Sequence, residues 1–310
     1  MHVPVGQSQT EDLRAWSEAL PVGAAFTHLS SARLRGWWLP CPVEQPEFVA
    51  TLAGNRCPER AGLLVTRHKN SPRIEHVDRV PVTTAGETLL AAARDLGVLD
   101  LVLMGDSALR LGHCSLSDLG KTCAEQRAGV RQLRHAVALL DPRSESPWES
   151  VMRVLHRAAE IPVEPQRRFE TARGQFVARA DLWVVGTNRL HEYDGEVHRD
   201  LEVHRRDLRR DRALVEAGLE RLGFTANEIL HEGGALIASA DRLLGRGWDP
   251  SRLRRWTDLV ADSLYGPRGR GRVLSRWARA MPARTGKTAG RSMDFEPPSV
   301  QPSRNFRQAG

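Results

Sequence analysis

The sequence predicts an α/β protein with two domains and a basic C-terminal tail. Three observations support this prediction. The chain has 310 residues, which is more than one typical domain contains. Segments with helical periodicity are mixed with short β-type runs that end at turn residues. Hydrophobic residues make up 41% of the chain, which is enough for ordinary cores.

The first 140 residues predict an α+β region. We expect a flexible polar N-terminus over 1–12 and a folded region over 13–140. A helix over 85–98 begins after Thr83 or Thr84, which are typical capping residues. The other expected elements, in chain order, are two helices within 12–40, strands within 41–52, 61–69 and 77–84, and helices within 100–112, 115–126 and 129–140.

The second half predicts a helix–strand–strand–strand–helix–strand–helix order over residues 144–232. We assign a domain to 141–240 and a helical extension to 241–265. From residue 266 the chain turns to Arg, Gly, Pro and Ser with little periodicity. Such composition is typical of disorder, so we expect 266–310 to be a disordered basic tail.

The charge balance suits an anionic partner. The net charge is +7, and nucleic acid is the first candidate partner for a basic protein. An Arg-rich, GC-biased genome explains the same excess, because Lys69 and Lys121 are the only lysines before Lys287. Both explanations stay open. The four cysteines form no C-x-x-C pair, and we find no signal peptide or membrane-spanning stretch. We therefore expect a cytoplasmic protein with free thiols and no membrane partner.

The main candidate site is a group of carboxylates in two neighbouring strands. Ten residues separate Asp181 from Glu192, and a hairpin of that length can place both at neighbouring positions on one face. Side chains alternate along a strand, so Glu192 and Asp194 point to the same side. Carboxylates at this density repel one another without a cation, and hard oxygen ligands suit Mg²⁺ or Mn²⁺. Such an ion can stabilise a scissile phosphate and activate water.

Each of these residues also has a purely structural interpretation. Asp181 can be a hydrogen-bonded strand residue, Glu192 can pair with an arginine, and Asp194 begins an Asp-Gly turn. Glu149 occupies the third position of a helix capped by Ser146, where a capping box explains it. The functional alternative is a glutamate that faces the acidic cluster.

Two further features extend the candidate site. His198 can act as a general base or hold a phosphate, or it can simply be solvated. The charged helix that follows carries arginines that either contact phosphates or pair with its own aspartates. The candidates for DNA contact are Arg205, Arg206, Arg209 and Arg210.

Four blocks in this half resemble the very-short-patch-repair-like endonuclease domains, a group within the PD-(D/E)XK nucleases. The resemblance covers about 141–232 and rests on "ESPWESVMRVLH", "FVARADLW", "LHEYDGEVH" and "RRDLRRDRALVEAGLERLGFTANEIL". It implies a restriction-endonuclease-like fold, with acidic positions at Glu149, Asp181 and Glu192. Asp194 and His198 match the "DG…H" signature. Asp194 stands where the general pattern has a lysine, and Gly223 stands where many relatives have an arginine, which puts catalysis in doubt.

The N-terminal region is similar to AbiEi-type antitoxins of type IV toxin–antitoxin systems over about 13–120. This resemblance rests on "AAFTHLSSARLRGWWLP", "GLLVTRHK" and the segment 77–119, and it implies a cognate toxin as partner. The sequence thus supports two main hypotheses. One is a Mg²⁺- or Mn²⁺-dependent DNA endonuclease, and the other is a non-catalytic DNA-binding or antitoxin-type regulator. A third is a partner of a nucleotidyltransferase-like toxin.

Overall fold

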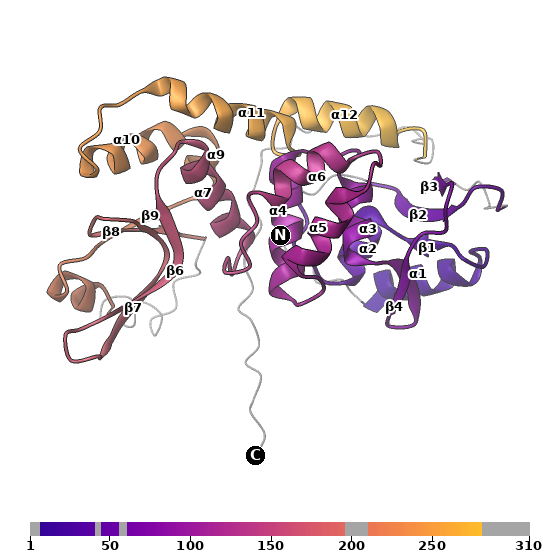
Figure 1. Cartoon of the computed structure of the whole chain (residues 1–310), viewed down its shortest axis with the longest axis horizontal. Coiled ribbons are helices and arrows are strands. Elements are labelled where there is room, and N and C mark those ends of the chain that lie inside the picture. The colour runs from indigo at the N-terminus through magenta and orange to yellow at the C-terminus, as the bar shows by residue number, and fades with distance from the viewer. Residues whose placement is uncertain (1–6, 41–44, 56–60, 196–209, 281–310) are drawn as a thin grey trace, which may run out of the picture.

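The α/β class is confirmed by the computed structural model, which describes residues 7–40, 45–55, 61–195 and 210–280 (Figure 1). The strands form two separate sheets, and helices accompany both of them. No described helix is long and apolar enough to cross a membrane.

The first sheet contains five strands in the order β3-β2-β1-β5-β4. Strand β1 pairs antiparallel with β2 and parallel with β5, whereas β2 and β3 are parallel and β4 and β5 form an antiparallel hairpin. The strands are β1 (Ala25–Phe26), β2 (Glu47–Leu52), β3 (Leu63–His68), β4 (Ile74–Val77) and β5 (Val80–Thr83).

Six helices accompany this sheet, and the alternation of side chains along β2 separates two cores. Phe48 packs into the large core beneath the later helices, while Val49 packs into a smaller core with Leu13 of the first helix. The helices are α1 (Gln7–Glu18), α2 (His28–Leu34), α3 (Ala85–Ala92), α4 (Val98–Arg110), α5 (Leu116–Ala124) and α6 (Val130–Val137). Because α1 begins at Gln7, the prediction of a flexible segment up to residue 12 is wrong for 7–12. Leu13 is 1% exposed and anchors the helix.

The second sheet has four strands in the order β6-β7-β8-β9. Strands β6, β7 and β8 are antiparallel neighbours, and β9 is parallel to β8. Residues 210–216 are helical, so the predicted order of elements is confirmed. The elements are α7 (Pro147–Ala158), β6 (Val163–Glu170), β7 (Phe176–Val184), β8 (Arg189–Tyr193), β9 (Glu220–Phe224) and α9 (Ala226–His231).

Helices α4 and α7 join the two sheets. Their apolar faces belong to one continuous core, in which Leu99 and Met104 lie in the same cluster as Trp148 and Val151. A buried ion pair between Arg153 on α7 and Asp106 on α4 lies at this junction. The burial of both charges is compensated by further hydrogen bonds, since Asp106 also accepts from Ser150 and from the Asp141 backbone.

The last helices return across the molecule to the first sheet (Figure 1). They are α10 (Gly233–Leu243), the 3-10 helix η1 (Pro250–Leu253), α11 (Arg254–Asp262) and α12 (Pro267–Trp277). The prediction of disorder from residue 266 is wrong for α12. Its composition is poor in apolar residues, but Val273 and Trp277 are each 1% exposed and fix the helix by tertiary packing. The rest of the predicted tail, 281–310, lies outside the described residues.

Candidate nuclease-type site

Glu149 lies in the first turn of α7 and only partly forms a capping box. The Ser146 hydroxyl accepts from the Glu149 backbone N–H at 3.2 Å, as a cap should. The Glu149 carboxylate does not complete the box. Its Oε2 accepts from the Glu145 backbone N–H at 2.8 Å and from the Gln166 side chain at 2.8 Å. Glu149 is 7% exposed, and this burial raises the pKa of its carboxyl. The Glu149 side chain is therefore directed to the sheet and does not cap its own helix.

The strand register brings Asp181 and Glu192 together. Leu182 pairs with His191 across β7 and β8, and continuing this register by one residue places Asp181 opposite Glu192. On the other side, β6 pairs Pro165 with Leu182 and Arg167 with Ala180. The residue between Pro165 and Arg167 is Gln166, which therefore lies beside Asp181. The ten-residue gap in the sequence thus corresponds to two carboxylates on adjacent strands.

Gln166 is a member of the site that sequence reasoning missed. Its φ of 56° lies in the left-handed region, which non-glycine residues rarely adopt. Its amide nitrogen Nε2 donates to Glu149 Oε2, but its buried Oε1 has no hydrogen-bond partner among the described residues. Strained backbone and unsatisfied buried oxygens both concentrate at functional sites. Pro165 was the available signal, because proline inside a strand marks an edge or an irregularity.

Asp181 is half-buried among negative charges. Burial is the main cause that raises the pKa of Asp181 to about 7, and the charges of Glu149 and Glu192 add to the rise. The hydrogen bond from the Tyr193 N–H and the charge of Arg210 oppose it. The Tyr193 backbone N–H donates to Asp181 Oδ2 at 3.0 Å. A carboxylate in this setting is stabilised by any added positive charge.

Glu192 is held by two arginines. It is 3% exposed, and its Oε1 is paired with Arg210 while Oε2 accepts from Arg221 Nε at 2.6 Å. Arg221 comes from β9 and also donates to Asp194 Oδ1 at 2.6 Å. The predicted pairing of Glu192 with an arginine therefore occurs. Glu192 and Asp194 share a face of the sheet, as strand alternation predicts.

The glycine at position 223 follows from the position of Asp194. Glu192 pairs with Gly223 in the parallel β8–β9 register. A Cβ atom on residue 223 would lie 1.6 Å from Asp194 Oδ2. Any side chain at this position would therefore have to displace the Asp194 carboxylate, which Arg221, two residues earlier on the same strand, holds in an ion pair.

His191 points away from the carboxylates, as expected for the neighbour of Glu192. Its Nδ1 lies 2.9 Å from His156 Nε2 on α7. Burial lowers the pKa of His156 to about 4 and is the main cause that lowers the pKa of His191 to about 2. Both rings are therefore neutral and belong to the core beneath the site.

Some predicted site residues cannot be placed. His198, Arg205, Arg206 and Arg209 lie outside the described residues. Of the four arginines expected to contact DNA, Arg210 is described, and it pairs with Glu192 and donates to the Arg179 carbonyl at 3.1 Å.

The donor atoms at this site suit a hard divalent cation. Carboxylate oxygens from Glu149, Asp181 and Glu192 and the unpartnered Gln166 Oε1 are the ligand types that Mg²⁺ and Mn²⁺ prefer. As arranged, no three acidic, His or Cys side chains in the described part of the chain converge closely enough to hold one ion. The Arg210 ion pair and the Gln166 amide occupy Glu192 and Glu149, so a cation requires these partners to move.

Comparison with known proteins adds no relative. No family model matches the chain, and neither a curated protein nor a solved structure is significantly similar to it.

Proposed function

We propose that the domain over 141–240 is a Mg²⁺- or Mn²⁺-dependent endonuclease that hydrolyses DNA phosphodiester bonds. The observation that carries the proposal is the row of Gln166, Asp181 and Glu192 across three adjacent strands, with Glu149 bonded to Gln166. These side chains come from four elements and bury several carboxylates at one place. Stability alone gives no reason to gather like charges in this way.

The residues have distinct roles under this proposal. Asp181 and Glu192 supply the first oxygen ligands, and Glu149 and Gln166 complete the oxygen-rich side of the site. A bound divalent ion would neutralise phosphate charge and lower the pKa of an attacking water. Arg221 places a fixed positive charge beside Glu192 and Asp194, where the resembled family's lysine would act. Arg210 closes over Glu192 until substrate or metal displaces it.

Cleavage of supercoiled plasmid in Mg²⁺ or Mn²⁺ tests the proposal. Wild-type protein should nick or linearise the plasmid, and chelator should abolish cutting. Asp181→Asn keeps the shape of the side chain but removes a charged ligand, so cutting should fall by about 100-fold or more, as expected for the loss of a central electrostatic group. The matched control is Glu170→Gln at the exposed end of β6, which should cut like wild type.

Metal binding gives a second readout. Mn²⁺ titration followed by electron paramagnetic resonance should show a bound ion in wild type and in Glu170→Gln, but weakened binding in Asp181→Asn. The proposal is contradicted if the protein cuts neither single- nor double-stranded DNA and also binds no Mn²⁺.

The ion pairs of Glu192 favour a second candidate, a non-catalytic DNA-binding regulator. Both carboxylate oxygens of Glu192 are already paired with Arg210 and Arg221. The charge of Glu192 is therefore balanced without a metal ion. DNA binding that is insensitive to chelator, with no cutting, supports this candidate. The Arg210→Gln variant separates the two, because a nuclease restrained by Arg210 should bind Mn²⁺ more tightly when the arginine is removed.

A further inference from the structure

A cavity of about 900 Å³ lies on the helix-covered face of the first sheet, far along the chain from the carboxylate site. Its walls come from β2, β3, α3 and the connection between α5 and α6. Five basic residues line it against two acidic ones. A concave site of this size with excess positive charge is suited to an anionic ligand larger than a simple ion.

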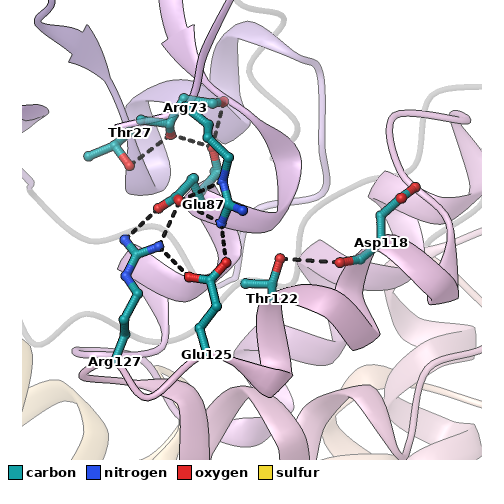
Figure 2. Close-up of polar contacts among 9 residues, drawn as sticks. Thr27, Arg73, Glu87, Asp118, Thr122, Glu125 and Arg127 are labelled. Carbon is teal, nitrogen blue, oxygen red and sulfur yellow. Dashed lines mark hydrogen bonds and ion pairs between the residues drawn. The ribbon is translucent and has the colours of Figure 1, made fainter. Parts of the chain in front are cut away.

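Two carboxylates hold two of the arginines in fixed orientations (Figure 2). Glu87 is 4% exposed and binds Arg127 through both oxygens, at 2.7 and 2.6 Å, and Arg73 Nε at 2.9 Å. Glu125 bridges the same two guanidinium groups, accepting from Arg73 at 2.6 Å and from Arg127 at 2.8 Å.

These contacts orient the arginines without using all their donors. The Nε of Arg127 and Nη1 of Arg73 donate to no described residue. Burial acts to raise the pKa of Glu87, but hydrogen bonds from Arg127 and Arg73 hold it below its ordinary value. The carboxylates therefore stay charged and preorganise the guanidinium groups, which reduces the entropy lost on binding.

Other cationic and polar groups in the cavity have no side-chain partner in the part of the chain that the structure describes. The Arg94 guanidinium forms no hydrogen bond or ion pair with a described side chain, and burial followed by the charge of Arg276 lowers its pKa. His68 lies on the same wall, and its buried Nε2 has no hydrogen-bond partner among the described residues. Lys69 follows it at the exposed edge. Among the described residues, this part of the cavity has more positive charge than ion pairs balance.

Part of the remaining lining is small and apolar, beside polar residues such as Asn70, Ser71 and Gln126. Ala50 on β2, Ala91 at the end of α3 and Ala128 before α6 leave volume beside the cations rather than filling it. An aromatic base or another flat apolar group can lie against such a surface, while phosphate oxygens accept from Arg94 and from the free donors of Arg73 and Arg127. The cationic and apolar surfaces together fit a ligand that carries both a phosphate and a flat apolar group.

We propose that this cavity binds a nucleoside phosphate, either as a free nucleotide or as the phosphorylated end of a nucleic-acid strand. Arg94 is the principal phosphate ligand, and Arg73 and Arg127 are positioned around it by Glu87 and Glu125. This site is independent of the carboxylate site on the second sheet, and its existence does not depend on nuclease activity.

Isothermal titration calorimetry of the full chain tests the proposal with three probes. They are ATP, inorganic pyrophosphate, and a short single-stranded oligonucleotide with or without a 5′-phosphate. Arg94→Gln should weaken binding by about tenfold or more, since one charge-assisted hydrogen bond is lost. Arg94→Lys should recover part of it. The matched control is Arg110→Gln, an exposed arginine at the end of α4, which should bind within about twofold of wild type because surface charges outside a site contribute little.

The results distinguish a free nucleotide from a strand end, and both from failure of the proposal. Binding of ATP but not of the 5′-phosphorylated strand assigns a free nucleotide, and the reverse assigns a strand end. Pyrophosphate binding as tightly as ATP overturns the nucleoside part. The proposal fails if wild type binds none of the probes, or if Arg94→Gln and Arg110→Gln weaken binding equally. Because Arg94 has no described side-chain partner, its variants should melt at the wild-type temperature, so lost binding reports the site rather than the fold.

Discussion

Arg221 on β9 donates from Nε to Glu192 Oε2 on the neighbouring strand β8 at 2.6 Å. The two strands are parallel, and Glu192 is 3% exposed, so the contact is shielded from water on one side. A buried carboxylate that loses its partner carries a large desolvation cost. The pair therefore makes the charge of Glu192 tolerable in this position.

Arg221→Ala should lower the free energy of unfolding by about 2 kcal/mol, because Glu192 then keeps only Arg210. Urea unfolding followed by circular dichroism measures the change. Arg268→Ala is the matched control, since Arg268 also pairs with two carboxylates, Asp258 and Asp262, but in full solvent. Its loss should be clearly smaller. Equal losses for both variants would show that Arg221 acts as an ordinary surface charge.

Gly223→Ala should lower the free energy of unfolding by about 1 kcal/mol, because the Asp194 carboxylate must shift and its ion pair with Arg221 is disturbed. The reason is the 1.6 Å approach that a Cβ would make to Asp194 Oδ2. Asp194→Ala removes the obstructing atoms, so the double variant Gly223→Ala with Asp194→Ala should be more stable than the two separate losses imply. A double-mutant cycle with no coupling would place Asp194 elsewhere.

Asp100 should make stability depend on pH. It is fully buried at the start of α4, where burial raises its pKa to about 7 although the N–H groups of Leu264 and Gly97 oppose the rise. The folded state thus keeps a proton that the unfolded chain releases near pH 4. This contribution is complete below about pH 4 and is lost as pH rises through about 7, amounting to at most about 4 kcal/mol.

Asp100→Asn removes that titration, so its stability relative to wild type should improve as pH rises from 5 to 8. Urea unfolding of both proteins at four pH values across this range measures the difference. Comparison within the pair cancels the shared contributions of Asp181 and of the buried histidines. Parallel curves would mean that Asp100 remains charged throughout.

Trp277→Ala should cost about 3–5 kcal/mol, as for other buried large aromatic residues. Its ring packs edge-on against Phe48 at 5.3 Å between centroids, and its Nε1 donates to Asp95 Oδ2 at 3.1 Å. Trp248, which is 45% exposed, is the matched control and should tolerate alanine with little loss. Thermal melts of both variants test this, and similar melting temperatures would contradict the docking of α12.

The order of elements in the second half was predictable because each apolar run there has a clear period and clear boundaries. The approach of Asp181 and Glu192 was predictable too, because a hairpin fixes its own register once its turn is short. The role of Arg221 was not, since a parallel neighbour such as β9 can pair in many registers. In a chain this rich in arginine, composition gave no reason to select one.

The features that were missed depend on tertiary contacts. Gln166 joins the site through a left-handed backbone conformation, which residue preferences argue against at a glutamine. Helix α12 has few apolar residues, and two buried side chains, Val273 and Trp277, decide its position. The cavity lined by Arg73, Arg94 and Arg127 combines β2, β3 and α3 with residues near 125–128. No local sequence pattern connects these segments.

The return of α11 and α12 to the first sheet has a consequence for protein synthesis. The Leu264 backbone N–H donates to Asp100. Trp277 donates to Asp95 and packs against His28 and Phe48. While the ribosome is still producing the second sheet, Asp100 therefore lacks its donor Leu264, and the ring of Phe48 is not yet covered by Trp277. We therefore expect the N-terminal region to complete its folding during translation only after about residue 280 has emerged.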